Sequence, residues 1–326
     1  MREKWKNKYS DFSDTINNVE SKFEYNGKLR IKLTDKCNLR CPFCHYEGTP
    51  KVKEISTEDT NLHKWLLIFR KYFNKIHLTG GEPTLYSRLK EIVKLFKKYE
   101  YEIVITTNGT ILNDDFKQLL PYFNYVNVSF HTLNSGYFED FVYTKEKSHF
   151  YIKKIMDNVL YLKNFYGKVR LNTVVTPMSE QNLLDIINFS MQNNIPLKLV
   201  PDWRFYKEGM DFINMTLTKH NFKLASIISK IPGSNVRKIF KNNEGYNIEV
   251  KDLHPCYLPF WCQKCELKEK CLETFAFLRL EGNPLKFKIC ISKPSINARL
   301  FEENIWPFLK IELVKALKYK EHLYEK

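Results

Sequence analysis

Three cysteines near the N-terminus, Cys37, Cys41 and Cys44, constrain this chain of 326 residues more than any other feature. Their spacing is C-x3-C-x2-C, and they directly follow an apolar-alternating stretch at 29–33 that predicts a strand. Each iron of a four-iron, four-sulfur (4Fe–4S) cluster takes one cysteine, so three cysteines leave one iron for a ligand that is not protein. An open coordination position separates a reactive metal site from a structural one.

Three other interpretations of the triplet stay open at this point. A structural zinc site could use His45 or a distant cysteine as its fourth ligand. The run from Cys41 to His45 also matches the C-x-x-C-H pattern of haem attachment, which needs an exported protein. The charged start of the chain, residues 1–6, lacks the apolar segment of a signal peptide. Finally, three reduced cysteines could simply pack in the core.

Three further motifs follow apolar stretches that read as strands. They are Thr79-Gly80-Gly81-Glu82-Pro83, Thr106-Thr107-Asn108-Gly109 and Val128-Ser129-Phe130-His131. Active sites of α/β barrels lie at the C-terminal ends of the strands. The sequence therefore predicts that these motifs and the cysteine triplet converge on one rim.

Strand-like and helix-like segments alternate over the first two thirds of the chain. Between the strands, apolar residues recur at helical spacing, as in Leu62, Trp65, Leu66 and Phe69, with Ser56 and Asp59 as the expected capping box of that helix. Alternation of this kind predicts a parallel sheet with crossover helices. The expected strands are 29–33, 75–78, 102–105, 125–130, 169–175 and 197–200.

The cysteine triplet and the three strand-end motifs, in this order, resemble the signature of the radical S-adenosylmethionine (SAM) enzymes. The resemblance is greatest to the GTP cyclase of molybdenum-cofactor biosynthesis and to the related auxiliary-cluster (SPASM/twitch) maturases. It covers about residues 28–200 and, more loosely, extends through Cys290. It implies an α/β fold, a partial (β/α)6 TIM-like barrel with a small C-terminal cysteine-rich auxiliary-cluster domain.

The same resemblance assigns roles to the motif residues. The cluster held by the triplet would bind SAM and, when reduced, cleave it to a 5′-deoxyadenosyl radical that abstracts hydrogen from a substrate. The expected SAM-binding residues are Phe43, Gly80, Gly81, Glu82, Thr107 and Ser129. His131 is a candidate substrate contact, although a lone histidine is more often a packed or surface residue.

The remaining cysteines cluster near the C-terminus. Cys262, Cys265 and Cys271 have C-x2-C-x5-C spacing, and Cys290 ends a hairpin pattern with a Gly-Asn turn. By the resemblance, these four cysteines are the expected ligands of a second 4Fe–4S cluster, with Cys256 spare or substituting for one of them. Structural zinc is the alternative, because C-x2-C spacing suits it equally well.

Three departures from the cyclase concern the substrate. The cyclase ends in a Gly-Gly tail, whereas this chain ends in Leu-Tyr-Glu-Lys. Of its two GTP-binding arginines, Arg279 matches one and Phe277 stands in place of the other. The spacing that ends at Cys271 is closer to the peptide maturases. The sequence therefore favours a peptide substrate, with a nucleotide or nucleoside as the alternative.

Composition limits the other possibilities. The net charge of +15, from 52 Lys and Arg against 37 Asp and Glu, favours anionic partners. Eight cysteines without an export signal predict a cytoplasmic enzyme, and no apolar run is long enough to span a membrane. A basic, zinc-containing nucleic-acid-binding protein is a distant alternative that leaves the strand-end loops unexplained. The expected partners are a peptide or anionic small molecule and an electron donor such as flavodoxin or ferredoxin.

The predicted organisation has four parts. An N-terminal arm spans 1–27, the radical SAM core 28–245, the auxiliary domain 246–300 and a C-terminal helix 301–326. Over 207–247 the strand pattern fades into helical and polar sequence.

Overall fold

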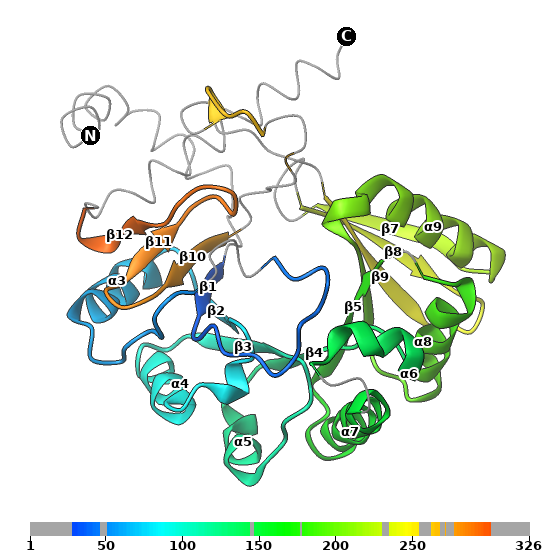
Figure 1. Ribbon diagram of the computed structural model, residues 1–326, viewed down its shortest axis with the longest axis horizontal. Helices are drawn as coiled ribbons and strands as arrows, with labels where there is room; N and C mark the ends of the chain where they lie inside the picture. Colours follow the sequence, from blue (N-terminus) through cyan, green and yellow to red (C-terminus); the bar gives the residue numbers. More distant parts are fainter. Residues whose placement is uncertain are drawn as a thin grey trace.

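The computed structural model describes residues 28–45, 51–143, 147–176, 178–229, 235–253, 262–267, 271 and 277–300 (Figure 1). The strands of these residues form one 12-stranded sheet, in the order β12-β11-β10-β1-β2-β3-β4-β5-β6-β9-β8-β7. The N-terminal arm predicted over 1–27 and the helix predicted over 301–326 lie outside the described residues.

Six parallel strands, in sequence order, form the centre of the sheet. The sheet is curved, and its concave side is the interior of a partial barrel (Figure 1). Parallel neighbours need crossover connections, and the helices between the strands supply them. The six strands and the partial barrel predicted from the sequence are thereby confirmed. The strands are β1 (Lys28–Lys32), β2 (Lys75–Thr79), β3 (Glu102–Thr107), β4 (Tyr125–Ser129), β5 (Val169–Val175) and β6 (Leu197–Pro201).

The helices lie on the convex, outer side of the sheet (Figure 1). They are α3 (Thr60–Arg70), α4 (Leu89–Lys98), α5 (Asp114–Leu119), α6 (Ser135–Phe138), α7 (Ser148–Tyr161), α8 (Glu180–Gln192) and α9 (Tyr206–Lys219). Short 3-10 turns occur at Pro83–Leu85, Leu120–Tyr122, Glu139–Phe141, Trp203–Phe205 and Ala298–Leu300, and a π-helical turn at Leu162–Tyr166. Among the described residues, no helix combines the length and apolarity needed to cross a bilayer.

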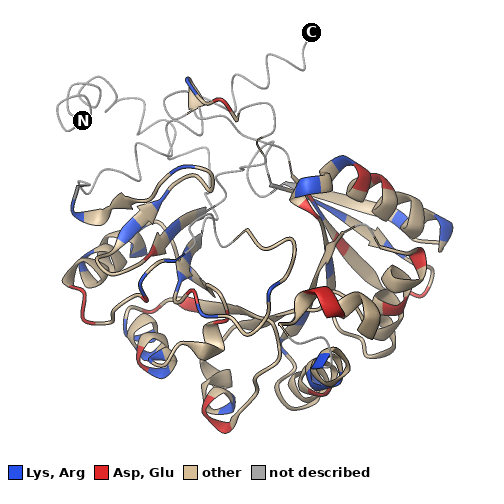
Figure 2. Cartoon of the chain, viewed as in Figure 1, with Lys and Arg blue, Asp and Glu red and all other residues tan. Residues whose placement is uncertain are grey.

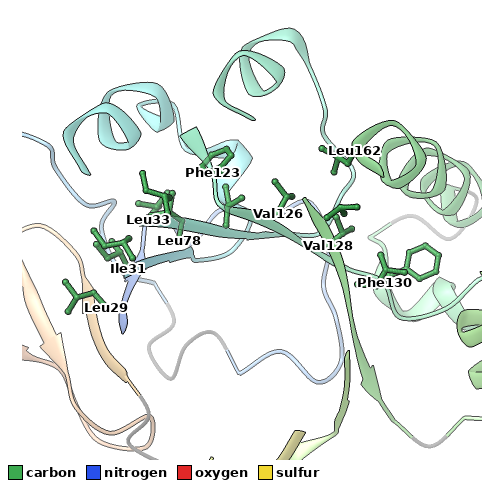
Figure 3. Close-up of a cluster of buried hydrophobic side chains, with 14 of the residues drawn as sticks. Leu29, Ile31, Leu33, Leu78, Phe123, Val126, Val128, Phe130 and Leu162 are labelled. Carbon is green, nitrogen blue, oxygen red and sulfur yellow. The ribbon is translucent and has the colours of Figure 1, made fainter. Parts of the chain in front are cut away.

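The main hydrophobic core lies between the sheet and these helices. Leu29 and Ile31 of β1 and Leu33 just after it are fully buried and belong to the same cluster as Leu78, Val126 and Val128 (Figure 3). On α3 the predicted apolar face is confirmed, because Leu62, Trp65, Leu66 and Phe69 are its buried residues. Successive side chains of a strand point to opposite faces, so the residues between these apolar positions face the barrel interior.

The capping box predicted before α3 is wrong in its detail. Asp59 is itself the N-cap, and its Oδ1 accepts a hydrogen bond of 2.8 Å from the Asn61 amide. Ser56 accepts instead from the amide of Glu58, outside the helix. Aspartate is among the preferred N-cap residues, so the helix begins after Asp59 rather than after Ser56.

The sequence predicts that the strands end near residue 207, and this prediction is wrong. After α9 the chain forms β7 (Lys223–Ser229), β8 (Asn235–Lys241) and β9 (Asn247–Leu253). β7 is the last strand of the sheet, and its Leu224, Ile227 and Ile228 are all exposed. The strand has no buried face, so its sequence lacks the apolar-polar alternation that would have predicted it. β8 and β9 pair with each other on either side of residue 245, and β9 also pairs in parallel with β6. The domain boundary near 245 stays a prediction.

The predicted C-terminal hairpin is confirmed as β10 (Phe277–Glu281) and β11 (Lys286–Lys288), followed by the short β12 (Ile296–Asn297). β10 pairs in parallel with β1 at the other edge of the six-stranded core. The Phe287 ring packs against Trp65 of α3, with ring centroids 4.8 Å apart. Asp59 Oδ2 accepts a hydrogen bond of 2.9 Å from the Leu285 amide, so the cap of α3 also holds the hairpin turn.

We therefore expect Asp59→Ala to lower the free energy of unfolding by about 2 kcal/mol, because it removes both a helix cap and the acceptor of the Leu285 amide. Asn113→Ala is the matched control, since Asn113 only caps α5, and it should cost about 1 kcal/mol. Urea denaturation of the two variants measures the difference. Equal losses would show that the contact to the hairpin does not contribute.

Candidate functional site

The loop that follows β1 carries the three N-terminal cysteines along the inner side of the sheet (Figure 1). Residues 41–44, which we call the cluster turn, close with a hydrogen bond of 3.0 Å from the Cys44 amide to the Cys41 carbonyl. Pro42 stands at the second position of this turn, where its fixed φ is favourable. The Arg40 amide donates to the carbonyl of Phe141, at 2.9 Å, and ties the loop to the segment after β4.

The three thiols lie close enough to influence one another. Burial raises the pKa of Cys37 to about 11, and burial together with the neighbouring Cys37 and Cys44 raises that of Cys41. Thiolates placed this way need a cation to offset burial and mutual repulsion, as a 4Fe–4S cluster would. Across the described part of the chain, no three His, Cys, Asp or Glu side chains converge on a position for a single ion.

The glycines after β2 let two backbones approach each other. The Gly81 amide donates to the Thr34 carbonyl and the Glu82 amide to the Lys36 carbonyl, both at 2.7 Å. A Cβ at Gly80 or Gly81 would collide with backbone atoms of residues 34–36. The close approach is thus between two backbone segments of the chain, at the start of the cysteine loop. Contact of this loop with SAM stays a prediction.

Glu82 connects the loops that follow β2 and β3. Its fully buried carboxylate accepts hydrogen bonds from the Thr107 hydroxyl at 2.7 Å and from the Asn108 amide at 2.6 Å. Thr84 donates two more, from its amide and its hydroxyl. Burial raises the pKa of Glu82, although the four donors oppose that shift. Glu82 and Thr107, both predicted to bind SAM, therefore bind each other in this structure.

Sequence reasoning missed a set of polar residues beside Cys37. The Asn108 amide group donates to Asn38 Oδ1 at 2.8 Å and lies 3.9 Å from the Cys37 sulfur. Asn38 in turn donates to the Thr110 hydroxyl at 2.8 Å, and Thr110 donates to Asn108. The motif at 106–109 was predicted to lie on the shared rim, but no role was assigned to Asn108 itself. Its position at a strand end, on the same rim as Cys37, is the signal that could have identified it.

The Phe43 ring of the cluster turn packs against the ring of His131. Their ring centroids are 4.7 Å apart, and Phe141 lies 5.5 Å from Phe43. His131 Nδ1 accepts a hydrogen bond of 3.1 Å from the Val174 amide, and burial lowers the pKa of His131 to about 3. The ring is therefore neutral near pH 7. Ser129 is half-buried at the end of β4, and the ligand contacts expected of these residues stay predictions.

The C-terminal cysteines are partly within the described residues. Cys262 and Cys290 are buried, Cys265 and Cys271 are half-buried, and the Cys265 amide donates to the Cys262 carbonyl at 3.2 Å. None of the seven described cysteines forms a disulfide. Cys256 lies outside the described residues, and the predicted ligand set of the second cluster stays a prediction.

Basic side chains occupy the inward positions of β1, β10 and β11. In the ladder Arg279 stands between Arg30 and Lys288, while Glu281 stands between Lys32 and Lys286. These residues alternate with Leu278, Leu280 and Phe287, which pack on the helix side. Figure 2 shows the basic bands on the β10–β11 hairpin. Arg279, Lys288 and Lys32 are at most 5% exposed.

Comparison with known proteins agrees with this geometry. The family model of the Radical SAM superfamily matches residues 31–190. The GTP 3′,8-cyclase of Aquifex aeolicus is 27% identical over 255 residues, which cover 73% of this chain and 76% of that protein. The GTP 3′,8-cyclase of Clostridium perfringens is 32% identical over 212 residues, which cover 62% of each chain.

Among solved structures, Streptococcus suis SuiB bound to precursor peptide SuiA matches with a TM-score of 0.60. The match covers 90% of this chain and 67% of that one at 14% identity, so it bears on the fold alone. SuiB bound to S-adenosylmethionine matches with a TM-score of 0.58 and spans 66% of that chain. Sequence motifs, the parallel barrel and the matched family agree, and the chain belongs to the radical SAM superfamily, as an enzyme that uses SAM and a 4Fe–4S cluster.

Proposed function

We propose that this radical SAM enzyme acts on an anionic substrate, and that a nucleotide or nucleoside phosphate is the class that its interior fits best. The observation that carries the proposal is the excess of basic side chains at the inward positions of β1, β10 and β11. β1 leads directly into the loop that carries Cys37, Cys41 and Cys44, and β10 and β11 follow β1 in the sheet.

In this proposal the three cysteines hold the cluster, which supplies reductive cleavage of SAM when both are bound. The residues around them serve to hold the loop in place. The Gly80-Gly81 backbone supports residues 34–36, and Asn108 lies beside the Cys37 sulfur. Neutral, buried His131 and the Phe43 ring form an apolar wall that excludes water from one side of the turn.

The charge balance at the inward positions favours anion binding. Among the described inward positions of β1, β10 and β11, Arg30, Lys32, Arg279, Lys286 and Lys288 accompany Glu281, and Asp35 pairs with Lys32 after the end of β1. A surface with more basic than acidic side chains raises the local concentration of anions. Arginine is also suited to phosphate, because its planar guanidinium donates two parallel hydrogen bonds. A substrate phosphate is therefore the kind of anion that these side chains would recognise.

The curated relatives support the nucleotide class, since the two cited above are named GTP 3′,8-cyclases. Phe277 stands where the sequence analysis expects a second GTP-binding arginine. We therefore propose the class of nucleotides and nucleoside phosphates as substrates, within which GTP cyclisation is one possible reaction.

A peptide is the second candidate, and it was the first choice from the sequence alone. The C-x2-C-x5-C spacing of Cys262, Cys265 and Cys271 favours it, as does the fold shared with SuiB, whose solved complex contains a precursor peptide. The basic interior favours a nucleotide over a peptide and so reverses the preference drawn from the sequence. An electron donor such as flavodoxin or ferredoxin and a cytoplasmic location both stay predictions.

Replacing Cys37, Cys41 and Cys44 together by alanine should abolish formation of 5′-deoxyadenosine from SAM under dithionite, because the cluster loses all three ligands. Anaerobic incubation followed by chromatography of the nucleoside measures this. Continued cleavage by the triple variant would refute the assignment of the first cluster.

The double variant Cys262→Ala and Cys265→Ala serves as the comparison. It should lower the iron content by roughly half and leave the spectrum of the first cluster in place, if each site holds one four-iron unit. Iron content equal to that of the unmodified protein would contradict the second cluster.

Arg279→Gln should weaken GTP binding at least tenfold, about 1.4 kcal/mol, because a buried charged hydrogen bond to phosphate is lost. Calorimetric titration with GTP and with guanosine measures this, and the original protein should bind GTP more tightly than guanosine. Arg88→Gln is the control, since Arg88 pairs with Glu58 and Glu91 on the outer surface. Equal binding of GTP and guanosine would argue against phosphate recognition and in favour of the peptide class.

A further inference from the structure

The loop after β6 reaches across to the cluster turn. Residues 202–205, which we call the β6 loop, directly follow Pro201 at the end of that strand. Arg204 Nη1 donates to the carbonyl of Pro42 at 2.9 Å, and the Trp203 indole donates to the carbonyl of Phe43 at 3.3 Å. Two consecutive carbonyls between Cys41 and Cys44 thus accept hydrogen bonds from side chains some 160 residues away.

A buried carboxylate fixes the arginine of this loop. Arg204 Nη2 lies 2.6 Å from Asp202 Oδ2, and its Nε lies 3.1 Å from each Asp202 oxygen. Asp202 is fully buried, and its amide donates to the Val175 carbonyl at the end of β5. Asp202 is thus held by the ends of both β5 and β6. The Arg204 guanidinium that it binds therefore has little freedom to leave the cluster turn.

The opposite side of the turn is held independently. The Phe43 ring packs against His131 and Phe141, and the Arg40 amide donates to the Phe141 carbonyl. The turn therefore lies between the segment after β4 and the β6 loop. A two-residue spacer between cysteines has few conformations once its carbonyls and its aromatic ring are both fixed.

We propose that Asp202 and Arg204 are positioning residues that hold the cluster turn in the conformation that binds iron, with Trp203 as a secondary support. This inference rests on the proposed role of Cys37, Cys41 and Cys44 as cluster ligands. The effect is geometric, because the Asp202 carboxylate neutralises the Arg204 charge within 3.1 Å. Only a planar, forked donor can bind the carboxylate at two points and the Pro42 carbonyl together.

Arg204→Lys tests this, since lysine keeps the charge and loses the fork. In the metal-free protein, amide hydrogen exchange of residues 40–45 should become about tenfold faster, as expected for one lost charged hydrogen bond. In the reconstituted protein, iron release to a chelator should accelerate by a similar factor. Trp203→Phe keeps an aromatic ring and loses the indole N–H that donates to the Phe43 carbonyl, so it should accelerate exchange two- to threefold.

Arg237→Lys is the matched control, because Arg237 pairs with Glu249 on the neighbouring strand, and it should change neither rate. Exchange and iron release in Arg204→Lys equal to those of the original protein would overturn the inference. The same changes in Arg237→Lys would also overturn it, since they would show a general loss of rigidity. An original protein that takes up no iron would contradict the cluster assignment, whereas exchange in the metal-free protein would still test the positioning role.

Discussion

The contact between the loop after β2 and the start of the cysteine loop is the constraint on which the candidate site depends. Gly81 and Glu82 donate their amides to carbonyls of residues 34–36, an approach that only residues without a side chain permit at Gly80 and Gly81. Once the backbones meet, the Glu82 carboxylate is buried and needs hydrogen-bond donors, which Thr107 at the end of β3 and Asn108 just after it supply. One pair of glycines thereby joins three strand ends into a single rim.

The division of the sheet into two faces explains how a stable barrel can contain so many charges. Its outward positions, such as Leu29, Ile31 and Leu33, form the core with the helices and provide the hydrophobic stabilisation. Its inward positions are released from that role and can carry Arg30, Lys32 and their neighbours. Because the two sets alternate along each strand, a shift of one residue in register would exchange core and interior. The same register therefore determines both which side chains form the core and which charged side chains face the interior.

Much of this architecture could be predicted from the sequence, because strand ends, glycine pairs and cysteine spacing are local patterns. The six core strands and the C-terminal hairpin were found in that way. The strands β7 and β8 were not, since exposed residues such as Leu224 and Ile227 lack the alternation that marks a half-buried strand. Nor could sequence reveal that Glu82 binds Thr107, or that Arg204 reaches Pro42, because both contacts depend on tertiary packing.

The two strands that extend the core show where specificity can vary. A six-stranded open sheet leaves unpaired backbone groups along β1 and β6, and such edges are prone to wrong pairings. Here β10 covers β1 and β9 covers β6, so strands from beyond residue 246 complete both edges of the core. The same strands bring Arg279 and Glu249 to the inner face, while the cysteine loop stays on the first six strands. Changes in the C-terminal strands can thus alter the side chains of the inner face and leave the loop that carries Cys37, Cys41 and Cys44 intact.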